Sequence, residues 1–252
     1  IFDPQDPSRY FSFMGQRADR NPVELIKTEL SDNEYKLLDW DGTVRLNILP
    51  GLNTQVTYSN QYVGSFGGYF LPSTNTKTNM SEANRSYGQT DKSAVEWLVN
   101  YNKSFGDHSV KAMAGYSWQS ITNSGFSATN KQFANDGTTY NSLGQGEWGL
   151  EEGHDGTSSY KNNSKLIAFF GRLNYDYMSK YLLTLSLRYE GSSKFGINNK
   201  WGYFPAVSAG WRMSKENFMS CCSGWLNDLK IRADFGVTGN QDFDSYKSLN
   251  TM

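Results

Sequence analysis

The chain has 252 residues, of which 37% are hydrophobic, and its mean hydropathy is −0.64 with a formal net charge of −1. No segment approaches the roughly 18 consecutive apolar residues that a spanning helix needs, so a helical membrane protein is excluded. Lysine and arginine are scattered singly rather than in stripes, which argues against a nucleic-acid partner.

Residues 1–34 are predicted to form an irregular external loop. Asp3-Pro4, Asp6-Pro7 and Asn21-Pro22 are turn-forming pairs, and no hydrophobic period is sustained between them. The chain begins at Ile1 without a methionine or a signal segment, which predicts a mature or truncated piece of a longer protein.

After this loop, alternation at a period of two residues predicts about eight strands. Aromatic residues make up 15% of the chain, and 24 glycines accompany only 6 prolines, a balance typical of many strands joined by tight turns. The predicted strands cover residues 35–49, 52–65, 92–105, 108–123, 163–177, 180–193, 200–213 and 227–238.

The strand over 200–213 shows the alternation most clearly. One face is apolar, carries Trp201 and Trp211 towards its two ends, and comprises Trp201, Tyr203, Val207, Ala209, Trp211 and Met213. The opposite face comprises Gly202, Phe204, Ala206, Ser208, Gly210 and Arg212. At about 3.3 Å per residue and about 40° of tilt, the distance from Trp201 to Trp211 is roughly 25 Å, the height of the apolar band of an outer-membrane barrel.

The predicted connections are short at one end of the strands and long at the other. Pro50-Gly51, Gly106-Asp107 and Met178-Ser-Lys180 make short turns, whereas residues 65–91 and 124–163 are predicted to be long polar loops. Transmembrane barrels have short periplasmic turns and long extracellular loops. This asymmetry predicts that the external segments are residues 1–34, 65–91, 124–163 and 194–200 and the C-terminal tail from Asp242 to Met252.

Two runs near the C-terminus resemble the barrel signature of SusC/RagA-type TonB-dependent outer-membrane transporters. They are Arg188-Tyr-Glu-Gly-Ser-Ser-Lys-Phe-Gly-Ile-Asn-Asn-Lys-Trp-Gly-Tyr-Phe-Pro-Ala-Val-Ser-Ala-Gly-Trp-Arg212 and Leu229-Lys-Ile-Arg-Ala-Asp-Phe-Gly-Val-Thr-Gly-Asn-Gln241. Glu190 stands where the family usually has Asp. The motif positions are Gly191, Ser192, Ser193, Phe195, Gly196, Trp201, Gly202, Phe204, Pro205, Gly210, Trp211, Arg212, Gly239, Asn240 and Gln241.

The resemblance implies an all-β fold, an antiparallel transmembrane β-barrel of about 22 strands of which this chain is a partial barrel over 1–252. It implies location in the outer membrane of a Gram-negative bacterium, a plug domain outside this chain, a SusD-like lipoprotein lid and energy coupling by the TonB-ExbB-ExbD complex. Oligosaccharide import is the expected function, and oligopeptide import is the alternative within the family. A passive porin, a soluble β-rich binding module and an outer-membrane enzyme are the remaining alternatives.

Charged residues of the inward faces are predicted to line the lumen, where they contact substrate, the plug or each other across strands. They are Arg45, Lys111, Arg172, Arg188, Glu190, Arg212, Lys230, Arg232 and Asp234. Aromatics near the outer mouth could stack on a sugar or pack within their own loops. They are Phe66, Tyr69, Phe70, Trp148, Phe195 and Phe204. Arg188, Glu190 and Arg212 join Phe66, Tyr69, Trp148, Phe195 and Phe204 as substrate-binding candidates.

No catalytic site, metal site or cofactor is predicted. The carboxylates of Glu147, Glu151, Glu152 and Asp155 have no EF-hand spacing, so a solvated loop is favoured over a calcium site. His108 and His154 are far apart, without a Ser or Cys constellation. Cys221 and Cys222 are predicted to be a loop pair, with a vicinal disulfide or a metal site as the alternative.

Overall fold

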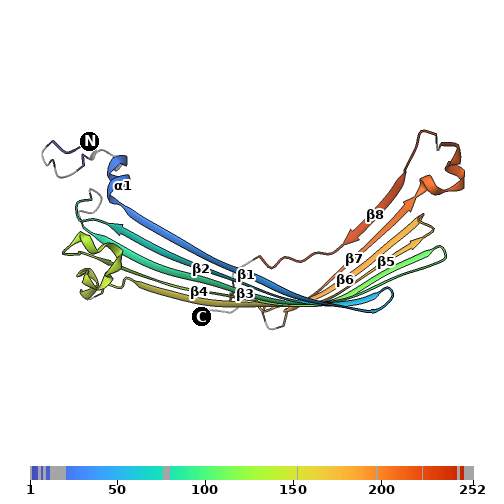
Figure 1. Cartoon of the computed structure of the whole chain (residues 1–252), viewed down its shortest axis with the longest axis horizontal. Coiled ribbons are helices and arrows are strands. Elements are labelled where there is room, and N and C mark those ends of the chain that lie inside the picture. The colour runs from blue at the N-terminus through green and yellow to red at the C-terminus, as the bar shows by residue number, and fades with distance from the viewer. Residues whose placement is uncertain are drawn as a thin grey trace. The chain divides into compact units, whose positions relative to one another are not determined.

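The structure is a computed structural model that describes residues 2–4, 7, 10–11, 21–75, 80–151, 153–196, 198–222, 224–242 and 245–246. Its strands form one eight-stranded sheet in chain order, from β1 to β8 (Figure 1), in which β5 and β6, β6 and β7, and β7 and β8 pair antiparallel. The described sheet is open, with β1 and β8 at its edges. The predicted all-β fold of about eight antiparallel strands is confirmed.

The strands are β1 (Leu30–Leu49), β2 (Leu52–Leu71), β3 (Glu82–Phe105), β4 (His108–Lys131), β5 (Thr157–Tyr177), β6 (Tyr181–Ser192), β7 (Trp201–Arg212) and β8 (Lys230–Gly236). The helical segments are α1 (Pro22–Thr28) and the 3-10 turns η1 (Asp136–Asn141), η2 (Leu143–Gln145), η3 (Trp148–Leu150), η4 (Met213–Lys215) and η5 (Asn217–Cys222). No described helix is long and apolar enough to cross a membrane.

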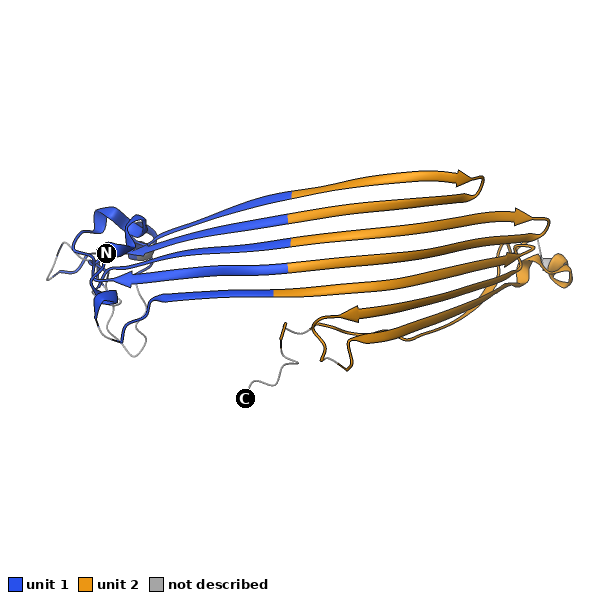
Figure 2. Cartoon of the chain, turned by 90° about the horizontal axis from the view of Figure 1, so that it is seen from below, with its two compact units in different colours: residues 1–38, 62–91, 122–162 blue, residues 39–61, 92–121, 163–252 orange. Residues whose placement is uncertain are grey.

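The chain divides into two compact units, coloured separately in Figure 2. Unit 1 comprises residues 1–38, 62–91 and 122–162, and unit 2 comprises residues 39–61, 92–121 and 163–252. Strands β1 to β5 contribute residues to both units, whereas β6, β7 and β8 belong to unit 2 alone.

The prediction of an irregular loop over residues 1–34 is wrong at its C-terminal end. Residues 22–28 form α1, and β1 begins at Leu30. The side chain of Asn21 accepts a hydrogen bond of 3.0 Å from the Val23 amide, and Pro22 takes the first helical position, where its missing N–H costs nothing. The same Asn-Pro pair that signalled a turn therefore starts a short helix.

The two predicted polar loops are also shorter than expected. Strand β2 continues to Leu71 and β3 begins at Glu82, while β4 continues to Lys131 and β5 begins at Thr157. The extensions of β3, β4 and β5 are mostly polar on both faces, and the β2 extension Phe66-Gly-Gly-Tyr-Phe-Leu71 is glycine or apolar on both, so they lack the apolar alternation by which a strand is recognised. Hydrogen bonding to neighbouring strands stabilises them as strands in spite of their composition.

The core of unit 1 lies where β2 ends and β3 begins. Phe70, Ala83 and Phe133 are buried, and Tyr140 and Leu143 pack against them. The rings of Phe70 and Phe133 meet edge to face at 6.2 Å between centroids. The connection from β4 to β5 is thus folded onto the strand ends.

In unit 2 the short turns are hydrogen-bonded to the neighbouring hairpin. Asn102 donates its amide to the Gly51 carbonyl at 2.7 Å, and Met178 donates to Asp107 at 2.8 Å. Arg212 donates to Lys180, also at 2.8 Å. Each turn therefore helps to set the register of the next strand pair.

Candidate functional site

One face of the unit 2 sheet is apolar and exposed. Along β6, Tyr181, Leu183, Leu185 and Leu187 are exposed, whereas the alternating residues Leu182, Thr184, Ser186 and Arg188 are half-buried. Register places Leu185 opposite Leu173 of β5 and opposite Val207 of β7, so apolar side chains form a continuous surface across the strands.

Aromatic rings border this apolar surface at both strand ends. At one end Tyr189 stacks on Trp201 and Tyr203, with centroids 4.6 and 4.4 Å apart. At the other end, the ring centroid of Tyr177 lies 6.3 Å from that of Tyr181 and 4.8 Å from that of His108. An apolar band between two aromatic rows is the pattern of a barrel surface that contacts lipid. We name this surface the apolar belt. It comprises Leu173, Leu183, Leu185, Leu187 and Val207 together with the aromatic residues at its two ends.

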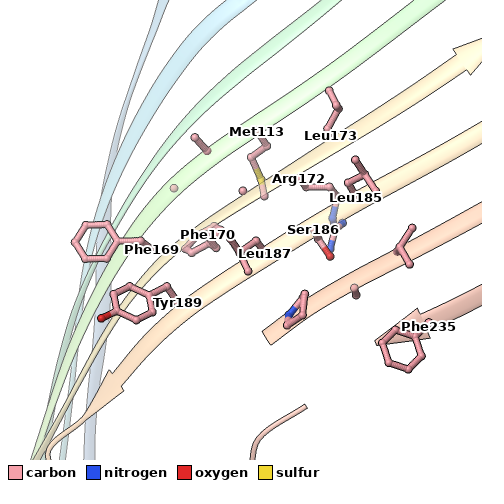
Figure 3. Close-up of a pocket in the computed structure, with 16 residues that line it drawn as sticks. Met113, Phe169, Phe170, Arg172, Leu173, Leu185, Ser186, Leu187, Tyr189 and Phe235 are labelled. Carbon is pink, nitrogen blue, oxygen red and sulfur yellow. The ribbon is translucent and has the colours of Figure 1, made fainter. Parts of the chain in front are cut away.

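A hollow of unit 2 has a volume of about 810 Å³, and its lining includes several residues of the apolar belt. Figure 3 shows Phe169 and Tyr189 at one end of it and Phe235 at the other, with Leu173, Leu185 and Leu187 between them. Because the lining is almost wholly hydrocarbon, this hollow suits an acyl chain better than a polar solute.

The opposite face of unit 2 is polar and charged. It carries two adjoining hollows of about 450 and 480 Å³ that share Asn174, Thr184, Ser208 and Arg232. Of the predicted lumen residues, these hollows bring together Lys111, Arg172, Lys230, Arg232 and Asp234. We name this surface the polar wall.

Fixed hydrogen bonds orient the charges of the polar wall. The Arg232 Nε donates to Ser208 at 3.1 Å and to the Asp234 carboxylate at 2.8 Å. Arg45, on edge strand β1, is occupied in the same way, because its Nε donates to Gln55 at 2.9 Å. Both side chains of the Arg232 and Asp234 pair are more than half exposed, so the pair contributes little stability and remains accessible to a solute.

Arg188 and Glu190 form an ion pair with each other on β6. The Arg188 guanidinium also lies over the Phe170 ring, 5.5 Å from its centroid. The ion pair joins two residues of one strand, so it is not the inter-strand charge pairing that was the alternative to substrate contact. Only the Arg188–Phe170 contact crosses between strands, from β6 to β5.

Arg212 lies at the short-turn end of unit 2. Its Nε is 3.3 Å from the Asp228 carboxylate, and its Nη1 donates to the Ser179 carbonyl at 3.5 Å. Arg212 therefore joins the β5–β6 turn to the segment that leads into β8, whereas Arg188 lies near the other end of β6.

Glu216, which the sequence did not single out, is the most heavily bonded carboxylate at this end. It accepts hydrogen bonds from the Tyr181 hydroxyl at 2.7 Å, the Trp211 indole at 3.0 Å and the Lys180 ammonium at 3.0 Å. These three donors, of which Tyr181 contributes most, lower the pKa of Glu216 to about 2. No local sequence motif predicts these hydrogen bonds, because the donors come from the start of β6 and the end of β7.

The family motif is built from glycines that aromatic rings cover. A Cβ at Gly191 would lie 2.6 Å from the Trp201 ring of the paired strand, and one at Gly202 would lie 2.9 Å from the Phe204 ring. A Cβ at Gly239 would also overlap Phe204. Phe204 thus lies on β7 rather than in a loop, packed on two motif glycines.

Other motif residues lie at the end of β6 and in the turn that follows it. The Ser192 amide donates to the Lys200 carbonyl at 2.9 Å, and the Ser193 hydroxyl accepts from the Lys165 amide at 2.8 Å. Phe195 follows in this turn, its amide 3.4 Å from the Ser192 carbonyl. A hollow of about 350 Å³ lies between this turn and the run Gly239-Asn-Gln241.

The other candidate aromatics belong to unit 1. Phe66 is 38% exposed on β2, where it contacts Tyr87 at 4.8 Å and the Lys36 ammonium at 5.1 Å. Phe70 is buried in the core and Tyr69 beside it is half-buried, so β2, not a loop, carries all three.

Trp148 is covered by its own loop. Its ring stacks on His154 at 4.4 Å between centroids and lies under the Lys131 ammonium at 5.3 Å. His154 is also held by Glu151, at 3.2 Å. These contacts match the loop self-packing that was the alternative to sugar binding.

The acidic loop shows local capping. The Thr157 amide and hydroxyl both donate to Asp155 at 2.8 Å, and these bonds lower the pKa of that carboxyl. Glu152 lies outside the described residues, as do the side chains of Cys221 and Cys222 and most of the tail 242–252. Within the described part of the chain, no group of three or more His, Cys, Asp or Glu side chains could hold a metal.

His108 takes part in an aromatic cluster on β4. Its ring stacks on Phe105 at 5.4 Å, and its Nδ1 is 2.7 Å from the Tyr175 hydroxyl. The ring therefore extends the aromatic row at the short-turn end of the apolar belt.

An antiparallel sheet with an apolar belt on one face and a polar wall on the other defines the wall of a β-barrel. Residues 2–249 match the family model described as TonB dependent receptor-like, beta-barrel, and the chain belongs to this family. The resemblance to SusC/RagA-type transporters is thereby confirmed.

Named relatives support this assignment. The chain is 35% identical over 231 residues to TonB-dependent receptor P3 of Formosa agariphila, with 91% of this chain and 22% of the relative covered. It is 30% identical over 240 residues to TonB-dependent receptor SusC of Bacteroides thetaiotaomicron, with 88% and 21% covered. The chain thus spans about a fifth of the length of these relatives.

The fold is also that of a solved structure, the RagAB peptide transporter. The TM-score is 0.83 at 20% sequence identity, with 94% of this chain and 26% of that chain covered. At this identity the likeness shows the shared fold.

Proposed function

We propose that the chain forms part of the wall of a TonB-dependent import barrel in the outer membrane of a Gram-negative bacterium. The observation that carries this proposal is the separation of the unit 2 surface into the apolar belt, which would contact lipid, and the polar wall, which would line the lumen. Its energy source would be the TonB-ExbB-ExbD complex acting through a plug domain, and its lid a SusD-like lipoprotein.

The polar wall supports passage of a hydrophilic solute. Arg172, Lys230 and Arg232 place cationic groups beside amides and hydroxyls, and the Asp234 carboxylate is bonded to Arg232. Mixed donors and acceptors of this kind can exchange hydrogen bonds with a moving solute without holding it tightly.

Oligosaccharides are the proposed substrate class, and oligopeptides are the second candidate. The second candidate is favoured by one specific observation, the fold likeness to a structure named as a peptide transporter.

The test is uptake by the full-length receptor, produced together with its lid protein in the outer membrane of a Gram-negative host. Fluorescently labelled hexasaccharides and hexapeptides of similar mass are added to cells with and without a functional TonB. We expect accumulation of one class only, and only in the TonB-positive cells. Equal entry in both strains would indicate passive diffusion and would sink the proposal of energised import.

A further inference from the structure

In unit 1, the face of β4 and β5 that carries Asn123, Asn162, Ser127 and Ser158 also carries an exposed aromatic ring that no motif predicted. Tyr160 of β5 is 56% exposed. Its ring reaches across the neighbouring strand, because a Cβ at Gly125 of β4 would lie 2.9 Å from the Tyr160 Cε1 and hydroxyl oxygen. The hydroxyl extends further, to within 3.7 Å of a Cβ at Gly88 of β3. Three strands therefore form this one feature.

Glycine at 88 and 125 explains why the ring lies there. A side chain at Gly125 would displace the ring, so the missing side chains leave a shallow strip into which Tyr160 fits. More than half of the ring remains in contact with solvent. Trp148 differs in this respect, because its ring is stacked on His154.

Uncharged hydrogen-bonding groups flank the position of Tyr160 along the strands. On one side Asn123 donates to Asn162 at 3.1 Å and accepts from Thr90 at 2.7 Å. On the other side the hydroxyls of Ser127 and Ser158 are 2.8 Å apart. Asn162 and Ser158 are each two residues from Tyr160, so all three side chains share one face of β5.

The exposed ring of Tyr160 and the uncharged polar residues near it favour one chemical class of ligand. A pyranose presents an apolar C–H face to an aromatic ring and a rim of hydroxyls that act as both donors and acceptors, which suits amides and hydroxyls. A charged peptide end or a uronate would require an opposite charge, and none of the five polar residues beside the ring is ionisable.

We infer that Tyr160 is a stacking platform for an uncharged sugar ring, with the Asn123–Asn162 pair and the Ser127–Ser158 pair as its hydrogen-bonding partners. The inference rests on the proposed function, import by a barrel whose polar side lines the lumen, and specifies one sugar subsite within it.

The experiment measures binding by the full-length receptor with its lid protein, in detergent, by isothermal titration calorimetry. The probes are malto-, cello-, xylo- and mannohexaose, and the hexasaccharide that binds wild type is used for the variants. Loss of one aromatic stacking contact should raise the Kd about tenfold in Tyr160→Ala. Tyr160→Phe retains the ring and should stay within about twofold of wild type.

Phe126→Ala is the matched control. Phe126 is 55% exposed, close to Tyr160 in accessibility, but it follows Gly125 directly and therefore points to the opposite face of β4. It contacts Tyr87 there at 6.0 Å. This variant should bind the sugar as wild type does. Thermal unfolding of each variant shows whether the barrel remains folded.

Two results would overturn the inference. If wild type binds a hexasaccharide and folded Tyr160→Ala binds it equally well, the platform is refuted while oligosaccharide import stands. If wild type binds none of the four sugars but takes up hexapeptides in a TonB-dependent manner, the sugar platform falls and the import function survives with its other substrate class.

Discussion

At the scale of single residues, glycine occurs where a second backbone or an aromatic ring lies too close to the chain for a side chain to fit. Gly51 has φ of +85° in the turn after β1, and its carbonyl accepts a hydrogen bond from the Asn102 amide. A Cβ at this position would overlap the Asn102 carbonyl oxygen. Gly106 has φ of +57° in the next hairpin turn, but the space around it is open. Comparing an alanine substitution in each turn therefore distinguishes the cost of backbone strain from the cost of steric overlap.

Gly51→Ala should therefore be far more damaging than Gly106→Ala. The second substitution costs backbone strain alone, about 1–2 kcal/mol. The first adds an overlap with a fixed backbone atom, about 1–3 kcal/mol more. Urea unfolding of the full-length receptor, followed by tryptophan fluorescence, gives both values, and equal destabilisation of the two variants would contradict the overlap at Gly51.

At the scale of elements, unit 2 is joined at its short-turn end by side chains as well as by backbone. Met178 and Ser179 both have positive φ, 55° and 53°, and Lys180 donates to Tyr177 at 2.9 Å, which is a type I′ hairpin turn. Glu216, between η4 and η5, then accepts from Lys180 and Tyr181 beside this turn and from Trp211 at the end of β7. One carboxylate thus holds the β5–β6 turn against the β7–β8 connection.

This arrangement predicts a pH dependence. The pKa of Glu216 falls from its usual 4.5 to about 2 in the folded chain, so its contribution to stability is complete above about pH 4.5 and is lost as the pH falls towards 2. Glu216→Gln should lower the unfolding midpoint at pH 7, and the difference from wild type should shrink on acidification through that window.

The measurement is urea unfolding at pH 7, 4 and 3 in the full-length receptor. Glu34→Gln is the control, because the ion pair of Glu34 with Lys36 is more than 60% exposed on both sides and contributes little. A difference between Glu216→Gln and wild type that stays constant from pH 7 to pH 3 would refute the role of the ionised carboxylate.

At the scale of the whole molecule, the proposed function requires that one face of the sheet contacts lipid and the other contacts water. Leu185 lies four residues from each of the aromatic residues Tyr181 and Tyr189, in the middle of the apolar belt, and Ser186 beside it lies on the polar wall. A lysine in the middle of a lipid-facing band costs about 2–4 kcal/mol, whereas a lumen position tolerates charge.

Leu185→Lys should therefore destabilise the barrel by about 2–4 kcal/mol and Ser186→Lys by less than about 1 kcal/mol. Folding of the full-length receptor into lipid vesicles across a urea series measures both free energies. Equal tolerance of lysine at the two positions would contradict the assignment of the apolar belt to lipid.

The sequence predicted much of the fold and part of the candidate site. The alternation from Trp201 to Trp211 predicted the two faces of β7, and the residues proposed for the lumen include five that line the polar wall. It did not predict Tyr160, because an exposed tyrosine in a polar segment gives no signal unless the glycines of two other strands are known to lie under its ring.

Composition, period and motif by themselves determined the class of fold, the family and the separation of apolar from polar side chains, because each of these is a property of neighbours along the chain. Only the tertiary structure decided that β3 to β5 extend through polar segments, that Glu216 accepts hydrogen bonds from three donors and that Phe204 covers Gly202 and Gly239. These features depend on which residues of different strands lie opposite one another, and that register is set by hydrogen bonding across the sheet and by turn geometry.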